Sequence, residues 1–290
     1  MKKDNSEILN DNLNIEIELL LEALYRKHGY DFRNYGKAHI KRRVLHRLAA
    51  SGLNYVSDLQ HKLIYDDNFL KLLLDDLSIT VTEMFRDPDF YKAVRQEVFP
   101  ILKTYPFFKI WHAGCATGQE VYSMAIMLQE EGLLDRAQIY ATDFNNIALK
   151  KARDGIYPVD KIKEYTQNFQ RAGGKSSFSD YYTARYDSVI LDQSLKKNIV
   201  FADHNLVTDS VFAEVNMIVC RNVLIYFNKN LQERVFSLFE QSLIPGGYLC
   251  LGSKENLRFS NIFRNFEVEN DKEKIYKKQY QTRTIKKNNV

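Results

Sequence analysis

Two glycines and two acids in the middle of the chain have the types and the spacing of a nucleoside-binding site. Gly114 and Gly118 lie in a turn that follows the strand-like run 109–113, and Glu120 stands where a helix is expected to begin. Asp143 ends a second strand-like run, 25 residues after Gly118. Glycines let the backbone approach a ligand closely, and an acid at the tip of the second strand accepts hydrogen bonds from ribose hydroxyls. The spacing therefore predicts a nucleoside-binding α/β domain.

The glycine pattern also favours one kind of nucleoside. A dinucleotide-binding turn has three glycines and presents a helix N-terminus to a pyrophosphate. This turn has two glycines, and a carboxylate at the position of Glu120 repels a pyrophosphate but suits a ligand with hydroxyls and a sulfonium. The pattern favours S-adenosylmethionine over NAD, although such a strand, turn and helix also occur as plain α/β scaffolding.

The composition excludes several classes of protein. Of the 290 residues, 45% are hydrophobic and 27% charged, as in ordinary globular proteins, and a net charge of +4 does not argue for bulk nucleic-acid binding. Three cysteines without a CxxC pair and six histidines without ligand spacing predict no metal site. Charged residues interrupt the apolar runs, so we expect no membrane insertion and a cytoplasmic protein.

The segments that must position these residues change in type along the chain. Behind a flexible N-terminus, 1–14, residues 15–86 carry apolar positions at helical spacing and predict a small helical domain, followed by a linker helix at 87–106. From 107 to 278, strand-like and helix-like runs alternate, which predicts a mostly parallel sheet. The expected strands lie near 108–113, 137–142, 198–203, 215–220 and 247–252, and the expected helices near 120–131, 146–153 and 229–243.

One segment, 155–197, interrupts this alternation. It is far longer than an ordinary connection, and the strand-like content of 181–190 predicts a small inserted antiparallel β-subdomain. Such an insertion is either ornament or a contact with a substrate or partner. After the last expected helix, 265–269 and 274–277 read as a hairpin, and 279–290 form a basic tail.

Five stretches together resemble the CheR-type protein-glutamate O-methyltransferases of bacterial chemotaxis. They are 78–86, 113–120, 141–143, 220–227 and 243–249, of which 220–227 is the most specific, and the match covers about 15–278. The resemblance implies a helical domain followed by a Rossmann-like domain that carries the inserted β-subdomain. It implies methyl transfer from S-adenosyl-L-methionine, giving S-adenosyl-L-homocysteine, to glutamates on the cytoplasmic helices of a methyl-accepting chemoreceptor. A monomer is the default expectation.

The chain departs from the family pattern at two places. Gln119 stands where the family often has glutamate, so we carry the ligand role to Glu120. Met84 and Phe85 stand where the family favours an aromatic pair, which is a packing change.

The resemblance also assigns the site. Arg86 and Tyr226 take the catalytic roles: the planar fork of Arg86 holds the carboxylate of either the substrate or the cofactor, and Tyr226 lines the methyl channel. The alternatives are an interdomain salt bridge for Arg86 and core packing for Tyr226. The expected cofactor-binding residues are Thr80, Thr82, Arg86, Gly114, Glu120, Asp143, Asn205, Leu206, Arg221 and Asn222.

A glutamate acceptor requires no general base. Its free pKa is about 4.3, so it is ionised at neutral pH, and the protein must supply alignment and exclude water. The motifs contain no histidine or lysine base, which favours a carboxylate over an amine or hydroxyl acceptor.

The helix expected at 37–50 is basic. Its buried stripe is expected to be Ile40, Val44, Leu45 and Leu48, and its docking cations Lys37, Lys41, Arg43 and Arg47. The opposite face is either simply solvated or, as the resemblance implies, attracts the acidic methylation helices of a receptor.

The sequence bears differently on two other classes of function. Methyltransferases acting on the amino groups of nucleic-acid bases place an Asp/Asn-Pro-Pro-aromatic tetrad after the fourth strand, and here that place reads Cys220 to Val223 without a proline. The sequence is also compatible with a module that binds S-adenosylmethionine without catalysis and with a methyltransferase that acts on a protein outside chemotaxis.

Overall fold

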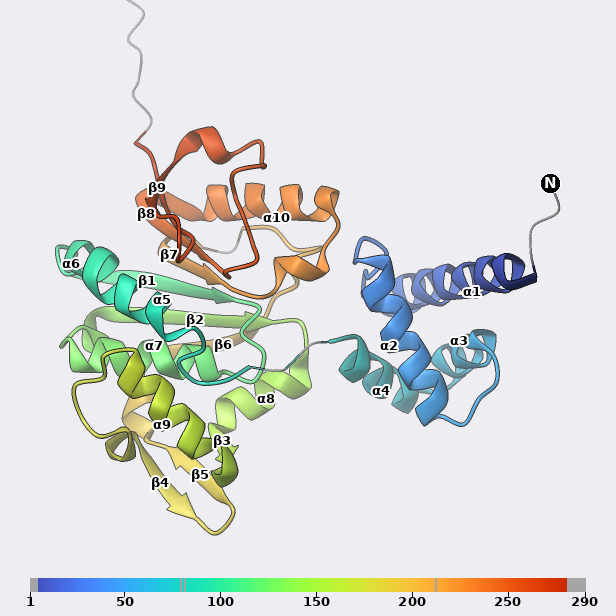
Figure 1. Cartoon of the computed structure of the whole chain (residues 1–290), viewed down its shortest axis with the longest axis horizontal. Helices are drawn as coiled ribbons and strands as arrows, with labels where there is room; N and C mark the ends of the chain where they lie inside the picture. Colours follow the sequence, from blue (N-terminus) through green and yellow to red (C-terminus); the bar gives the residue numbers. More distant parts are fainter. Residues whose placement is uncertain (1–4, 79, 81, 212, 281–290) are drawn as a thin grey trace, which may run out of the picture.

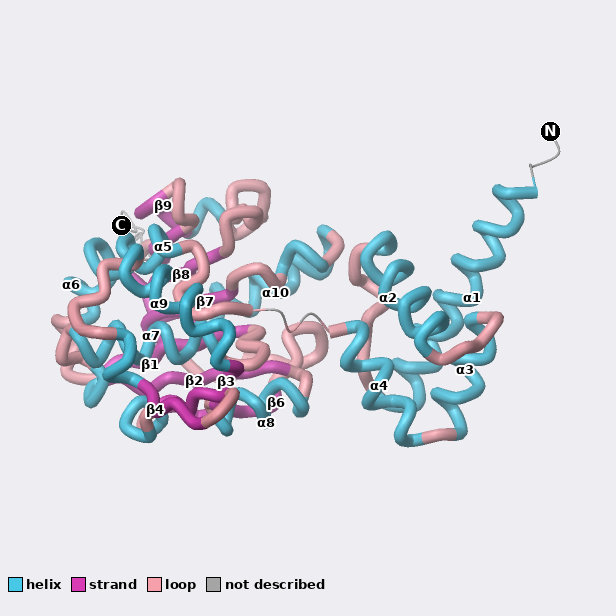
Figure 2. The backbone as a smooth tube through the Cα atoms, turned by 60° about the horizontal axis from the view of Figure 1, so that its bottom comes forward, coloured by secondary structure: helices cyan, strands magenta, loops and turns pink. Residues whose placement is uncertain are grey.

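The computed structural model describes residues 5–78, 80, 82–211 and 213–280. Four helices form one body, and a sheet with helices on both faces forms a larger body beside it (Figure 1). A second view of the backbone shows the same two bodies side by side (Figure 2).

The smaller body is the helical domain. It consists of α1 (Asn5–His28), α2 (Lys37–Ala50), α3 (Val56–Tyr65) and α4 (Asp67–Leu77), whose apolar faces enclose buried side chains such as Leu24 and Val44. A flexible segment was expected at 1–14. This prediction is wrong for 5–14, because α1 already begins at Asn5. No glycine or proline interrupts this stretch, and Leu13 packs against the core, so nothing ends the helix there.

The helical stretch expected at 87–106 is broken into three pieces. They are α5 (Pro88–Ala93), a π-helical turn (Val94–Val98) and α6 (Phe99–Leu102). Pro100 has no N–H to donate to the backbone of the preceding turn, and the chain widens into the π turn just before it.

A seven-stranded sheet is the centre of the larger body. Its strands, in spatial order, are β6 (Ile199–Asp203), β2 (Ala137–Asp143), β1 (Phe108–Ala113), β7 (Val215–Cys220), β8 (Leu243–Leu251), β10 (Ile275–Lys278) and β9 (Phe266–Asn270). The first five run parallel, and the last two close the edge antiparallel. The mostly parallel sheet and the terminal hairpin are therefore confirmed.

Both faces of this sheet are buried. Ile110 points into the core beneath α7 (Gln119–Glu130), and its neighbour Trp111 points into the core beneath α10 (Lys229–Ser242). The helix α8 (Asn146–Asp154) follows β2 and contributes Leu149 to the α7 side. A strand covered on both faces needs consecutive apolar residues, which is why the strand runs were readable from the sequence.

The inserted segment folds as the expected antiparallel sheet. Its strands β3 (Ile156–Pro158), β5 (Ser188–Leu191) and β4 (Tyr182–Arg185) pair in that order, and a helix that was not expected, α9 (Ile162–Arg171), lies between β3 and β4 in the chain. Short 3-10 helices complete the fold at Leu134–Arg136, Val159–Lys161, Phe178–Tyr181, Gln193–Lys196, Leu224–Tyr226 and Phe263–Asn265.

A loop of the helical domain, 34–36, is hydrogen-bonded to the segment 226–228, which follows β7 in the chain. The backbone N–H of Gly36 donates to the Tyr226 carbonyl (2.8 Å), and that of Asn228 donates to the Asn34 carbonyl (2.9 Å). Tyr35 pairs with Phe227 as an isolated β-bridge, and their ring centroids lie 4.9 Å apart. The helical domain thus covers the carboxyl edge of the parallel strands, where α/β folds bind their ligands.

Candidate functional site

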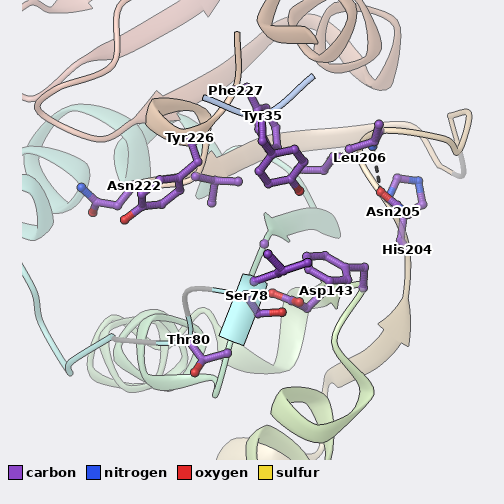
Figure 3. A pocket seen from close by; sticks show the side chains of 15 residues that line it. Tyr35, Ser78, Thr80, Asp143, His204, Asn205, Leu206, Asn222, Tyr226 and Phe227 are labelled. Atoms are coloured by element: carbon purple, nitrogen blue, oxygen red, sulfur yellow. Dashed lines mark hydrogen bonds between the residues drawn. The ribbon is translucent and has the colours of Figure 1, made fainter. Parts of the chain in front are cut away.

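A cavity lies at the carboxyl ends of the parallel strands and has walls from both bodies. Figure 3 shows Asp143, Ser78 and Thr80 on one side of it and Tyr35 and Tyr226 on the other. Of the expected cofactor-binding residues, the cavity is lined by Thr80, Gly114, Asp143, Asn205, Leu206 and Asn222. The rest of the lining consists of Tyr226, expected as a catalytic residue, and of residues for which no site role was expected: Tyr35, Leu77, Ser78, Phe144, His204, Val207, Val223 and Phe227.

Asp143 is the acid at the tip of β2. Its two carboxylate oxygens accept the backbone N–H groups of Asn145 and Ala116, both at 2.9 Å, which fixes the side chain at the cavity wall. Burial raises the pKa of this carboxyl above its ordinary value, although these N–H groups oppose the change. Each oxygen retains a lone pair, so the carboxylate can still accept two hydroxyl hydrogen bonds from a ligand.

Two residues that line the cavity have a left-handed backbone conformation. Gly114 has φ of 77°, and a Cβ there would lie 2.7 Å from a methyl group of Val223, so only glycine fits. Asn222 also adopts a left-handed conformation, with φ of 62°. Across the cavity, the Asn205 side chain accepts the N–H of Val207 at 3.0 Å (Figure 3), so Asn205 holds a turn while it lines the wall.

A second cavity adjoins the first at Tyr226. It is lined by Thr82, Glu83, Arg86, Lys161, Glu164, Tyr165 and Tyr226, so Tyr226 is a wall of both. Among the described residues no carboxylate lies within ion-pair distance of Arg86, so the interdomain salt bridge considered for it is not formed there. Glu83 of the same cavity interacts with Arg86 electrostatically, since burial raises the pKa of Glu83 and the charge of Arg86 opposes this rise. Arg86 and Tyr226 are therefore brought together, with the Arg86 guanidinium available for a carboxylate.

The turn that carries Arg86 has an unusual backbone. Phe85 and Asp87 on either side of it have φ of 53° and 55°, a left-handed conformation that costs a non-glycine residue about 1–2 kcal/mol. The Phe85 N–H donates to the Ser123 hydroxyl at 2.9 Å, and the Arg86 carbonyl accepts from Arg221 at 3.2 Å. Contacts from outside the turn thus hold it in this shape.

Arg221 and Glu120 belong to a buried ionic network. The Arg221 side chain is only 2% exposed, contacts Asp87 (2.7 Å) and Glu120 (3.1 Å), and stacks over Phe90. Glu120 also contacts His112 Nδ1 at 3.2 Å. Burial alone raises the pKa of Glu120, but His112 and Arg221 outweigh it and hold that pKa below its usual value.

The direct ligand contacts that the sequence predicts for these two residues stay predictions. Neither Glu120 nor Arg221 lines the two cavities. The Arg221 guanidinium donates to Arg86, Glu120 and Asp87 and so supports the Arg86 turn, while its buried Nε has no hydrogen-bond partner among the described residues.

The buried and exposed faces of the basic helix α2 differ from those expected. Leu45 is 37% exposed, so it does not belong to the buried stripe. Arg47 forms an ion pair with Asp76 of α4, and Lys37 contacts Glu18 of α1 at 3.1 Å. Lys41 donates to Asn10 of α1. Three of the four expected docking cations thus bind within the helical domain.

Arg43 and its neighbour Arg42 lie on the side of α2 that meets Tyr226. The His39 ring packs 4.7 Å from the Tyr226 ring, and Arg42 contacts His39 Nδ1 at 3.4 Å. Burial, Arg43 and Arg42 lower the pKa of His39, in that order of effect. Among the cations of α2, Arg42 and Arg43 are therefore the ones beside the His39 ring that packs on Tyr226. Helical periodicity did not single out this pair.

Neither a membrane span nor a metal centre is found in the part of the chain that the structure describes. No helix there is both long and apolar enough to cross a bilayer, and no three histidine, cysteine, aspartate or glutamate side chains are grouped to hold a metal ion.

Comparison with known proteins identifies both bodies. The family model for the CheR methyltransferase SAM-binding domain matches residues 80–273, and that for the CheR methyltransferase all-alpha domain matches 15–78. Cher3 of Pseudomonas putida, whose name describes a methyltransferase, is 52% identical over 267 residues, covering 92% of this chain and 98% of that protein. The chemotaxis protein methyltransferases of Salmonella typhimurium and Listeria monocytogenes are 27% identical, covering 86% and 79% of this chain and 85% of each relative.

The fold, the cavity at the sheet edge and these matches define the class of protein. It is an S-adenosylmethionine-dependent methyltransferase built on a Rossmann-like domain. Within that class, the chain belongs to the CheR methyltransferase family.

Proposed function

We propose that this protein methylates glutamate side chains on the cytoplasmic helices of chemoreceptors and so acts in chemotactic adaptation. The observation that carries the proposal is the position of Tyr226, a wall shared by the cavity of Asp143 and the cavity of Arg86. One cavity suits a nucleoside, and the adjoining one offers a guanidinium that can hold a carboxylate. Relatives named as chemotaxis protein methyltransferases support the choice of acceptor.

The residues of the first cavity fit S-adenosylmethionine. Asp143 has free lone pairs for the ribose hydroxyls, and Leu206 and Val207 supply apolar wall for an adenine ring. Gly114 lets the backbone approach the ligand closely. When bound, the cofactor supplies a methyl group on a positively charged sulfur.

The residues of the second cavity orient the acceptor. The fork of Arg86 binds a carboxylate in a fixed plane, and Tyr226, which lines both cavities, borders the passage through which this carboxylate meets the methyl group of the cofactor. Because the acceptor is already ionised at neutral pH, positioning and exclusion of water are what these residues contribute.

The receptor docks on the side of α2 that faces Tyr226. Arg42 and Arg43 lie beside His39, which packs on Tyr226, so an acidic receptor helix on this side reaches the Arg86 cavity. Such a substrate places the protein on the cytoplasmic side of the membrane.

The test is methyl transfer from labelled S-adenosylmethionine to a chemoreceptor cytoplasmic fragment. We expect label that mild base releases as methanol, as from a carboxyl ester, and no label on a fragment whose acceptor glutamates are replaced by alanine. Arg86→Lys keeps the charge but loses the fork, and turnover is expected to fall by about tenfold or more. Unchanged affinity for the cofactor in this variant assigns Arg86 to the acceptor, and a parallel loss assigns it to the methionyl carboxylate.

Two results would contradict the proposal. Cofactor binding without transfer to any receptor fragment favours a non-catalytic binding module. Base-stable label, or label on another protein only, favours a methyltransferase with a different acceptor.

A further inference from the structure

The inserted segment 155–197 reaches the turn that carries Arg86. Its helix α9 places the Asn168 side chain so that Nδ2 donates to the Met84 carbonyl at 3.2 Å, although the two residues are 84 positions apart in the chain. The next residue, Phe169, packs its ring against Phe85, with centroids 5.2 Å apart in a T-shaped arrangement.

These contacts continue into the core of the insertion. Phe178 lies 6.3 Å from Phe85 and 5.5 Å from Phe169, and Tyr181 lies 5.9 Å from Phe169. Phe85, Phe169 and Phe178 are almost completely buried. The aromatic cluster of the insertion therefore includes the residue directly before Arg86.

The turn needs such support because of its backbone. Phe85 and Asp87 have left-handed φ angles of 53° and 55°, which side-chain-bearing residues keep only when the surroundings impose them. The main domain holds the turn at the Phe85 N–H through Ser123 and at the Arg86 carbonyl through Arg221. Met84, on the other side of Phe85, is held by the insertion.

We propose that the insertion is a positioning element for methyl transfer, in which Asn168 and Phe169 keep the Met84–Asp87 turn in the shape that aims Arg86 into its cavity. The inference rests on the proposed role of Arg86. It gives the insertion a task inside the site itself, apart from any contact it makes with a partner.

The test is Asn168→Ala, which removes the donor to Met84 and leaves Phe169 in place. Thr166→Ala is the matched control, because the Thr166 hydroxyl bonds only within α9, to the Ile162 carbonyl. We expect Asn168→Ala to lower kcat for methyl transfer about three- to tenfold, with KM little changed, and Thr166→Ala to leave both near wild type. Hydrogen exchange of peptides covering 84–87 is expected to speed up in Asn168→Ala alone.

A double-mutant cycle shows whether Asn168 acts through Arg86. In an Arg86→Lys background, Asn168→Ala is expected to have little further effect on kcat, because the aligned fork is already lost. An equal loss in both backgrounds overturns the inference, and so does a normal kcat in Asn168→Ala. If Arg86→Lys itself keeps full turnover, the proposed role of Arg86 is wrong, and the inference fails with it even where exchange has changed.

Discussion

Glu255 is predicted to determine the shape of the loop that carries Asn222 and leads to Tyr226. Its side chain is buried and accepts four backbone N–H groups, at 2.6–3.1 Å. Three of the donors belong to the loop, namely those of Asn222, Val223 and Leu224, and the fourth is Gly252. Asn222 is also the left-handed residue of this loop, so the carboxylate stabilises a conformation that the chain does not favour locally.

The loss of stability expected for Glu255→Gln, which replaces the carboxylate by a carboxamide, follows from these hydrogen bonds. The amide oxygen can accept about two of the four N–H groups, and the amide nitrogen then faces the other two. An unsatisfied buried donor costs about 1–3 kcal/mol, so the loss is about 2–6 kcal/mol before compensation. Burial raises the pKa of Glu255, which shows that the charged form is penalised, and removing the charge offsets part of the loss. We expect a net destabilisation of about 2–3 kcal/mol.

Thermal unfolding and calorimetric binding of S-adenosylhomocysteine measure both consequences. At about 2–4 °C per kcal/mol, the melting temperature is expected to fall by roughly 4–12 °C. Cofactor affinity is expected to fall by about three- to tenfold, because Asn222 and Val223 line the cavity. Glu240→Gln is the matched control, since that carboxylate accepts a single side-chain bond, from Asn265, away from the loop. If the two variants behave alike in both assays, the reasoning about this carboxylate is refuted.

Three further changes test other parts of the structure. Asp143→Ala is expected to weaken cofactor binding by about 1–3 kcal/mol in calorimetry, because two hydrogen bonds to a charged acceptor are lost. Charge reversal at Arg42 and Arg43 is expected to lower kcat/KM for a receptor fragment about tenfold at low salt without changing cofactor affinity, and added salt should shrink the difference. Burial raises the pKa of Glu131, but Lys175, Lys103 and Arg95 outweigh it and hold that pKa at about 2. A lowered folded-state pKa contributes stability above about 4.5 that is lost as the pH falls toward 2, and Glu131→Gln should remove this acid limb from unfolding curves.

Each of these has a control within the chain. Asp203, the partner of Asp143 on the neighbouring strand, ends β6 without lining the cavity and acts on Asp143 only through its charge, so Asp203→Ala should not weaken cofactor binding. Reversal of Lys37 and Lys41, which bind α1, should leave kcat/KM near wild type. If reversal of Lys37 and Lys41 lowers kcat/KM as much as reversal of Arg42 and Arg43, the whole basic helix takes part in docking. An unchanged acid limb in Glu131→Gln would show that other carboxylates set it.

Much of the fold could be predicted from the sequence because short stretches of chain specify its strands and helices. The runs at 108–113 and 137–142 are rich in apolar and aromatic residues, as strands of a covered sheet are, and each ends in a turn or an acid. The start of α1 was missed because polar residues continue a helix whenever nothing breaks it. The helix α9 was missed because its burial depends on the core of the insertion, which forms from distant segments.

The candidate site divides in the same way. By itself, the sequence determined the class of ligand at the sheet edge, because Gly114, Gly118 and Asp143 act through backbone conformation and strand-end position, which short stretches of chain specify. Only the tertiary structure decided which polar groups meet. It buried Arg221 in an ionic network, and it brought Tyr35 from the helical domain into the cavity wall. Partners distant in the chain meet only when the whole fold forms, since burial and pairing depend on every element that packs around a side chain and not on its neighbours in sequence.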